Sequence, residues 1–184
     1  SVRRFVQKAK GLIVTGETSF YGERGMARNC PGLADVLGIG EAEDALPPAV
    51  RDYMRVSRPH PVCAGVKPGD LVPRPALSRA VKPLESAHVL CRLLGDLPRR
   101  FAPWPPESPW PGILVNETQG RVVCFPGLIG AHYWGTRLRD HRGFILGALN
   151  WVAASVPARV QGPGNLEITL LGKPGLYLIH LVNF

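Results

Sequence analysis

The first residues place apolar and basic positions in the order that is typical of an amphipathic helix. Val2, Phe5 and Val6 fall on one face, and basic residues fill most of the remaining positions. Gly11 is expected as the helix C-cap, and the apolar run 12–15 follows at once as a short buried strand. A helix that leads into a buried strand is half of a β-α-β unit, so the pattern predicts an α/β fold with parallel strands.

Later apolar runs predict a hairpin followed by a long helix. The runs 112–117 and 121–125 flank a turn at Gly120, and Pro126 stops the second strand. The segment 140–154 has the apolar spacing and the length of a crossover helix.

The period of the apolar positions changes after residue 155. The segments 166–171 and 176–182 alternate between apolar and polar residues, which suits an antiparallel pair. We therefore expect two domains, the α/β domain over 1–155 and the beginning of a β-domain over 156–184. Both ends of the chain cut across expected elements, which predicts a piece of a longer protein.

The middle of the chain combines short apolar runs with loops rich in glycine and proline. The acidic and then proline-rich segment 41–49 is expected to be an exposed loop. The proline-dense segment 101–112 is expected to be a rigid connection whose Trp104 and Trp110 pack onto the domain, with a polyproline-II ligand for SH3-like domains as the alternative. The remaining expected elements are a short helix over 31–38 and strands over 53–56, 70–72, 80–82 and 87–93.

The turn after the first strand is the strongest candidate for a ligand site. Ligands of α/β proteins bind at the carboxyl ends of strands, yet this turn has no G-x-S-x-G or G-x-C-x-G nucleophile elbow. Glu17 is the most site-like carboxylate; its alternative role is to cap the loop or to accept backbone N–H hydrogen bonds. A site position without a nucleophile favours a non-catalytic domain. The residues expected to contact a ligand here are Gly16, Glu17, Thr18, Ser19 and Tyr21.

A second candidate is the aromatic run His132, Tyr133 and Trp134, which is expected in a glycine-rich loop after Gly127. These side chains could line a sugar cleft, because sugars stack on aromatic rings; anchoring of an interface or a core is the alternative. A triad of Ser19, His132 and Asp140 can be drawn, but triads are recognised by geometry, which sequence does not supply. We expect no catalytic residue in this chain.

His60 stands between two prolines, where it is expected to act as an orienting hydrogen-bond donor.

The composition argues against several other classes of function. The net charge of +8 comes largely from scattered arginines, without the basic block or aromatic stripe of a nucleic-acid interface, so no nucleic-acid partner is expected. Histidines and cysteines are dispersed and no phosphate-binding glycine motif occurs, so neither a metal nor another cofactor is expected. No apolar run is long enough for a membrane helix, and dispersed cysteines favour a reducing, cytoplasmic location.

Five segments, taken in chain order, resemble one family. They look like the region that follows the catalytic barrel in a group of glycoside hydrolases, a region similar to the β-galactosidase trimerisation domain. The resemblance implies a class I glutamine-amidotransferase-like, flavodoxin-like three-layer domain without its first strands, followed by a small β-domain. The segments are VTGETS (14–19), GLADVLGI (32–39), RPHP (58–61), GRVVCFPG (120–127) and HLVNF (180–184).

The resemblance also implies a function. The catalytic carboxylates would belong to an upstream (β/α)8 barrel of the same protein, and this chain would be a non-catalytic segment that supports homo-oligomer assembly and helps to wall a carbohydrate cleft. Working amidotransferases carry a Cys at the elbow and a later His-Pro-Glu, whereas this chain has neither at 14–19 or 125–127. Glutaminase chemistry is therefore not expected. The alternative is a stand-alone amidotransferase-like module that binds a small ligand at 16–21.

Overall fold

The computed structural model describes residues 1–8, 10–46, 52–95, 102–153 and 166–183. The chain divides into two compact units, Ser1–Ala154 and Ser155–Phe184, and each is described by itself. None of the helices in these described ranges is long and apolar enough to span a membrane.

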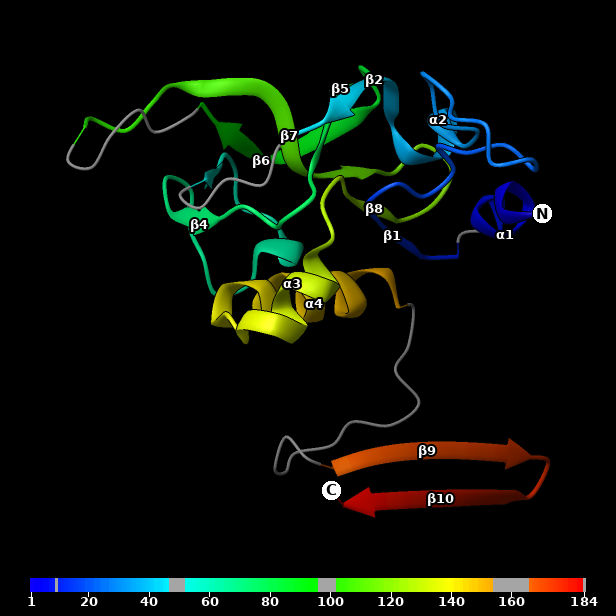
Figure 1. The fold of residues 1–184 in the computed structure, drawn as a ribbon. Helices are drawn as coiled ribbons and strands as arrows, with labels where there is room; N and C mark the ends of the chain where they lie inside the picture. The colour runs from blue at the N-terminus through cyan, green and yellow to red at the C-terminus, as the bar shows by residue number, and fades with distance from the viewer. Residues whose placement is uncertain (9, 47–51, 96–101, 154–165, 184) are drawn as a thin grey trace. The chain divides into compact units, whose positions relative to one another are not determined.

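A mixed six-stranded sheet forms the centre of the first unit (Figure 1). Its strand order is β1-β8-β7-β6-β3-β4; β1 and β8 are parallel, and the other neighbours are antiparallel. β1 is therefore in a parallel pair, but its partner β8 lies downstream, whereas the expected β-α-β unit places the partner strand before the first helix. The strands are β1 (Leu12–Thr15), β8 (Val122–Phe125), β7 (Glu107–Asn116), β6 (Ala87–Leu94), β3 (Tyr53–Val56) and β4 (Leu71–Pro73).

Both faces of this sheet are covered, which explains why β8 is buried at every position. Val123 and Phe125 belong to a core cluster with residues of η1, α3 and α4, whereas Val122 and Cys124 belong to a second cluster with residues of α1, α2, β2 and β5. Side chains alternate between the faces of a strand, so a continuous apolar run marks a strand covered on both. The covering elements are α1 (Val2–Gln7), α2 (Ala34–Leu37), β2 (Ile39–Ala45), β5 (Arg79–Pro83), η1 (Pro61–Cys63), α3 (Ile129–Thr136) and α4 (Arg139–Val152).

α4 lies close against η1 because a glycine faces the contact. A Cβ on Gly147 would lie 2.8 Å from the carbonyl oxygen of Pro61, so a larger residue would force the two elements apart. His60 caps η1: its Nδ1 accepts the N–H of Val62 at 3.2 Å, and its ring stands edge-on to Trp151. The expectation of a donor role is wrong at this nitrogen, because an N–H of the short helix needs an acceptor there.

Several expected boundaries differ from the structure, and three of them change an interpretation. The prediction of a loop over 41–49 is wrong for residues 41–45, which belong to β2 and pair with β5 in a small antiparallel sheet. Residues 47–49 lie outside the described residues. β7 begins at Glu107, inside the expected proline-dense connection. α1 ends at Gln7 with Lys8 as its C-cap, so Gly11 does not have that role.

The described strands do not confirm the flavodoxin-like arrangement, whose sheet is largely parallel. One parallel pair is joined here to a run of antiparallel neighbours, because consecutive hairpins connect β6, β7 and β8. The coarser α/β description applies: a mixed sheet with helices and small antiparallel sheets.

The second unit is an antiparallel pair, as the alternation predicts. β9 (Leu166–Lys173) and β10 (Leu176–Asn183) pair along their whole length. Tyr177, Ile179 and Leu181 alternate along β10 and share one face, and 58–75% of each is exposed. The pairing places Leu170 opposite Ile179 and Ile168 opposite Leu181 on this same face, which is therefore apolar.

Candidate functional site

The carboxyl ends of β1 and β8 lie side by side, and the predicted ligand turn begins there. The parallel register ends with Thr15 opposite Phe125, and the N–H of Gly16 donates to the carbonyl oxygen of Phe125 at 2.8 Å. Gly16 has φ of 57° and Ser19 has φ of 67°. Two of the four residues 16–19 therefore have a left-handed backbone conformation, which makes the turn tight. Glycine adopts that conformation at little cost. The hydroxyl of Thr18 completes the turn by donating to the carbonyl oxygen of Thr15 at 2.9 Å.

Glu17 is held by a basic and a phenolic side chain. Arg79 Nη1 donates to Glu17 Oε1 at 2.7 Å, and the Tyr21 hydroxyl donates to Oε2 at 2.9 Å. The hydrogen bond to Glu17, with the carboxylate's charge, raises the pKa of the Tyr21 phenol above its usual range. The Arg79 guanidinium also lies 4.8 Å from the centre of the Phe20 ring, a cation–π distance. Glu17 therefore makes an ion pair with a side chain, which differs from the loop-capping role considered for it.

Arg79 reaches this turn because β5 starts beside the end of β8. The N–H of Arg79 donates to the carbonyl oxygen of Pro126 at 3.1 Å. The Arg79 side chain is 13% exposed, and its Nε is buried without a hydrogen-bond partner among the described residues. Sequence reasoning missed Arg79, because nothing local connects it with a turn 62 residues earlier.

His132 lies on α3, so the expectation of a glycine-rich loop is wrong for residues 132–134. The segment Ile129–Thr136 is helical, and Ile129 is its buried residue. His132 Nδ1 accepts a hydrogen bond from the N–H of Ala76 at 3.1 Å, so the side chain links α3 to the segment before β5. Its ring stands edge-on to that of His141, whose Nε2 donates to the carbonyl oxygen of Pro73 at 2.8 Å. Burial lowers the pKa of His141.

Tyr133 and Trp134 form a separate group on the surface. The guanidinium of Arg137 lies 4.2 Å from the centre of the Trp134 ring and 5.7 Å from that of Tyr133. Trp134 is 72% exposed. Among the described residues, no hydrogen bond joins this group to the Glu17 network.

The described residues around Glu17 do not form a pair of carboxyl groups. Glycoside hydrolysis needs two carboxyl groups flanking the bond, and the hydrogen-bonded network described around Glu17 includes no second carboxylate. Ser19 Oγ accepts the N–H of Leu33 at 3.3 Å, and in the described ranges no hydrogen bond connects Ser19, His132 and Asp140. No group of three potential metal ligands occurs in the described part of the chain.

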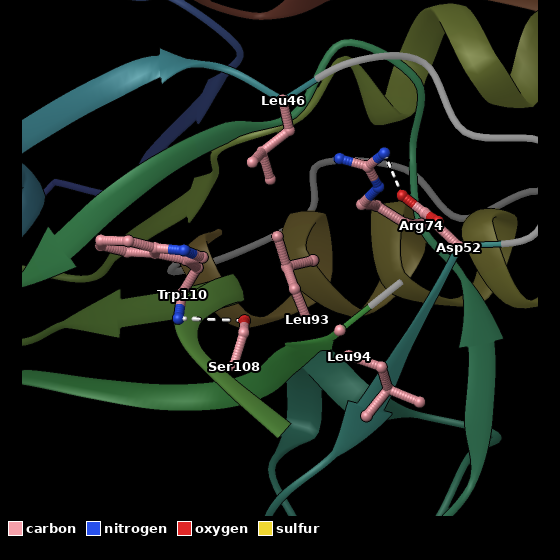
Figure 2. Close-up of a pocket in the computed structure, with 8 residues that line it drawn as sticks. Leu46, Asp52, Arg74, Leu93, Leu94, Ser108 and Trp110 are labelled. Atoms are coloured by element: carbon pink, nitrogen blue, oxygen red, sulfur yellow. Dashed lines mark hydrogen bonds and ion pairs between the residues drawn. The ribbon is translucent and has the colours of Figure 1, made fainter. Parts of the chain in front are cut away.

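A pocket of about 200 Å³ lies elsewhere in the first unit, among residues that sequence reasoning did not connect with one another (Figure 2). An ion pair between Arg74 and Asp52 forms part of its wall, and the two side chains are 5% and 13% exposed. Trp110 was expected to pack onto the domain, and it does so beside this pocket. The lining residues are Leu46, Asp52, Arg74, Leu93, Leu94, Gly95, Ser108 and Trp110.

Comparisons with known proteins show that the fold is similar to part of a β-galactosidase. No protein-family model matches the chain, and no curated protein matches it significantly. The chain is similar to the structure of a cold-adapted β-galactosidase from Rahnella sp. R3, with a TM-score of 0.65, 16% identity, and coverage of 99% of this chain and 24% of that chain. It is also similar to a cytoplasmic protein from Salmonella typhimurium LT2, with a TM-score of 0.57, 17% identity, and coverage of 82% and 58%.

These likenesses concern the fold alone. The chain spans about a quarter of the length of the β-galactosidase and less than two thirds of the Salmonella protein. The fold is therefore related to a region of a β-galactosidase.

Proposed function

We propose that this chain is a non-catalytic accessory and oligomerisation segment of a glycoside hydrolase, with the catalytic (β/α)8 barrel upstream in the same protein. The observation that carries the proposal is the fold likeness, which extends over 99% of this chain but 24% of the β-galactosidase. The charge-paired Glu17 agrees with a role outside catalysis.

The proposal includes the finer fold assignment. In it, β1 and β8 are the remaining parallel strands of a flavodoxin-like, amidotransferase-like domain, and β9 and β10 begin a β-domain. The turn at 16–21 would face the barrel or a carbohydrate in its cleft, since it lies at the carboxyl ends of the parallel pair.

The apolar face of β9 and β10 supports assembly. Large exposed apolar surfaces are typical of protein interaction sites, and Tyr177, Ile179 and Leu181 form such a surface. In this proposal the face is covered in the homo-oligomer.

Sedimentation velocity and an aryl-β-galactoside assay on the purified 184-residue chain test the proposal together. We expect an oligomer at micromolar concentration and no turnover. Replacing Ile179 and Leu181 by Asp should shift the chain toward monomer, whereas Met26→Asp, at a site 72% exposed in the first unit, should leave assembly unchanged. A monomeric wild-type chain would refute assembly, and measurable turnover would refute the accessory role.

The alternative is a stand-alone module that binds a small ligand at 16–21. The left-handed Ser19 favours it, because strained backbone gathers at functional sites. This module would remain monomeric and would lose ligand binding on Arg79→Met.

A further inference from the structure

We propose that the pocket beside the Arg74–Asp52 ion pair binds a neutral hexopyranose, a six-membered sugar ring that carries hydroxyl groups. The inference goes beyond the proposed function, because binding there requires neither assembly nor a catalytic barrel. The volume of about 200 Å³ suits a ligand smaller than most drug-sized molecules.

The ion pair supplies the polar side of the pocket. Arg74 and Asp52 are paired where little water reaches them, and leucines line the wall around them. A buried ion pair is often no more stabilising than apolar residues of the same size, so its stability contribution alone does not explain its presence. A guanidinium donates hydrogen bonds and a carboxylate accepts them, so the two can bind neighbouring hydroxyl groups of one ring while keeping their existing contacts.

The charges also select against other ligands. An anion in this pocket would meet the Asp52 carboxylate, and a cation would meet the Arg74 guanidinium. A purely apolar ligand would offer neither charged group a hydrogen bond. A neutral molecule with several hydroxyl groups can accept a hydrogen bond from the guanidinium and donate one to the carboxylate.

Trp110 supplies the apolar side, together with Leu46 and Leu93 (Figure 2). Its indole offers a flat surface for the C–H face of a sugar ring, and the half-buried side chain packs against the core. The ring face therefore has an apolar partner and the ring edge has a polar one, which is the division that a pyranose requires.

An irregular register between β6 and β7 brings Trp110 to this place. The register shifts on both sides of Arg92, and such irregularities re-aim side chains near binding sites. Two hydrogen bonds hold the distorted segment: Arg92 Nη1 donates to the carbonyl oxygen of Pro109 at 2.9 Å, and the N–H of Trp110 donates to Ser108 Oγ at 3.2 Å.

Isothermal titration of the full chain with D-galactose, D-glucose, D-mannose and cyclohexanol tests the inference. We expect saturable, millimolar binding of at least one sugar. Gly95→Leu should abolish it by filling the pocket, and a Cβ at Gly95 would lie 3.5 Å from Pro105, an ordinary contact that allows folding. Arg74→Met should weaken binding about tenfold or more, because it removes hydrogen bonds from a charged donor.

Arg55→Met is the matched control. Arg55 also lies in the sheet, its pair with Glu107 is partly exposed, and it does not line the pocket, so binding should be unchanged. Thermal unfolding checks that each variant is folded. Saturable binding that survives in folded Gly95→Leu would place the sugar elsewhere and overturn the inference, and so would binding of cyclohexanol alone or of no member of the panel. A wild-type chain that is monomeric but binds the sugar would refute the proposed function and leave the pocket assignment unchanged.

Discussion

The Arg79 guanidinium lies 2.7 Å from the Glu17 carboxylate across 62 residues of sequence. The contact joins β5 of the small sheet to the turn after β1, so two sheets meet at the predicted ligand turn. It also pairs the carboxylate that was the best candidate for chemistry with a guanidinium. The ion pair therefore ties the turn after β1 to β5.

Arg79→Met should lower the free energy of unfolding by about 1–2 kcal/mol. The change removes a charged hydrogen bond and the contact with Phe20, and the 43% exposure of the Glu17 side chain limits the loss. Urea unfolding measures the effect. The control is Lys82→Met on the same strand, where Lys82 and Glu41 are 56% and 70% exposed and the cost should be near zero. Equal costs for the two variants would contradict the role given to Arg79.

Gly16→Ala should destabilise the chain more than Gly25→Ala. Both glycines have positive φ, with 57° at Gly16 and 72° at Gly25, so each alanine costs about 1–2 kcal/mol of backbone strain. A Cβ at Gly16 would in addition collide with the Leu128 side chain, whereas the space at Gly25 is open. Paired urea titrations measure the difference, and a larger loss at Gly25 would show that the turn is packed differently.

Stability should fall as the pH drops below about 6.5, the ordinary pKa of histidine. Burial lowers the pKa of His141 in the folded state, so the unfolded chain binds the proton more readily. The stability that the neutral ring provides is therefore present above pH 6.5 and is lost as the pH falls through the lower, folded-state pKa. The slope of unfolding free energy against pH should flatten in His141→Leu. An unaltered slope in folded His141→Leu would assign the dependence to another group.

Cys30 should be the thiol that reacts rapidly in the native protein. Cys30 is exposed, whereas Cys63, Cys91 and Cys124 are buried. Burial raises the pKa of the Cys124 thiol to about 12, which further suppresses its reactive thiolate. Titration with an aromatic disulfide should detect one fast thiol before denaturation and four after it. Cys30→Ser should remove the fast phase; if that phase persists, one of the buried thiols is accessible in solution.

Short-range sequence patterns were sufficient to predict the elements that depend only on neighbouring residues. The hairpin around Gly120, the strand over 53–56 and the helix that the structure describes as α4 all follow from residues within a few positions of one another. The same holds for β9 and β10, because the alternation of apolar and polar residues in each segment predicts the antiparallel pair that they form. The turn after β1 could also be placed, because an apolar run that meets Gly16 is a local signal.

The sequence by itself determined that this is an α/β chain with a separate β-hairpin and a turn at a strand end; tertiary structure decided what that turn contains. The acidic run at 41–45 forms a strand because β5 supplies a partner from about forty residues away, and its polar composition alone favours a loop. Arg79 completes the Glu17 network, and Trp110 comes to line one pocket with Arg74 and Asp52, only when distant strands are in register. Periodicity records which face of an element is buried, but pairing between elements is set by long-range packing.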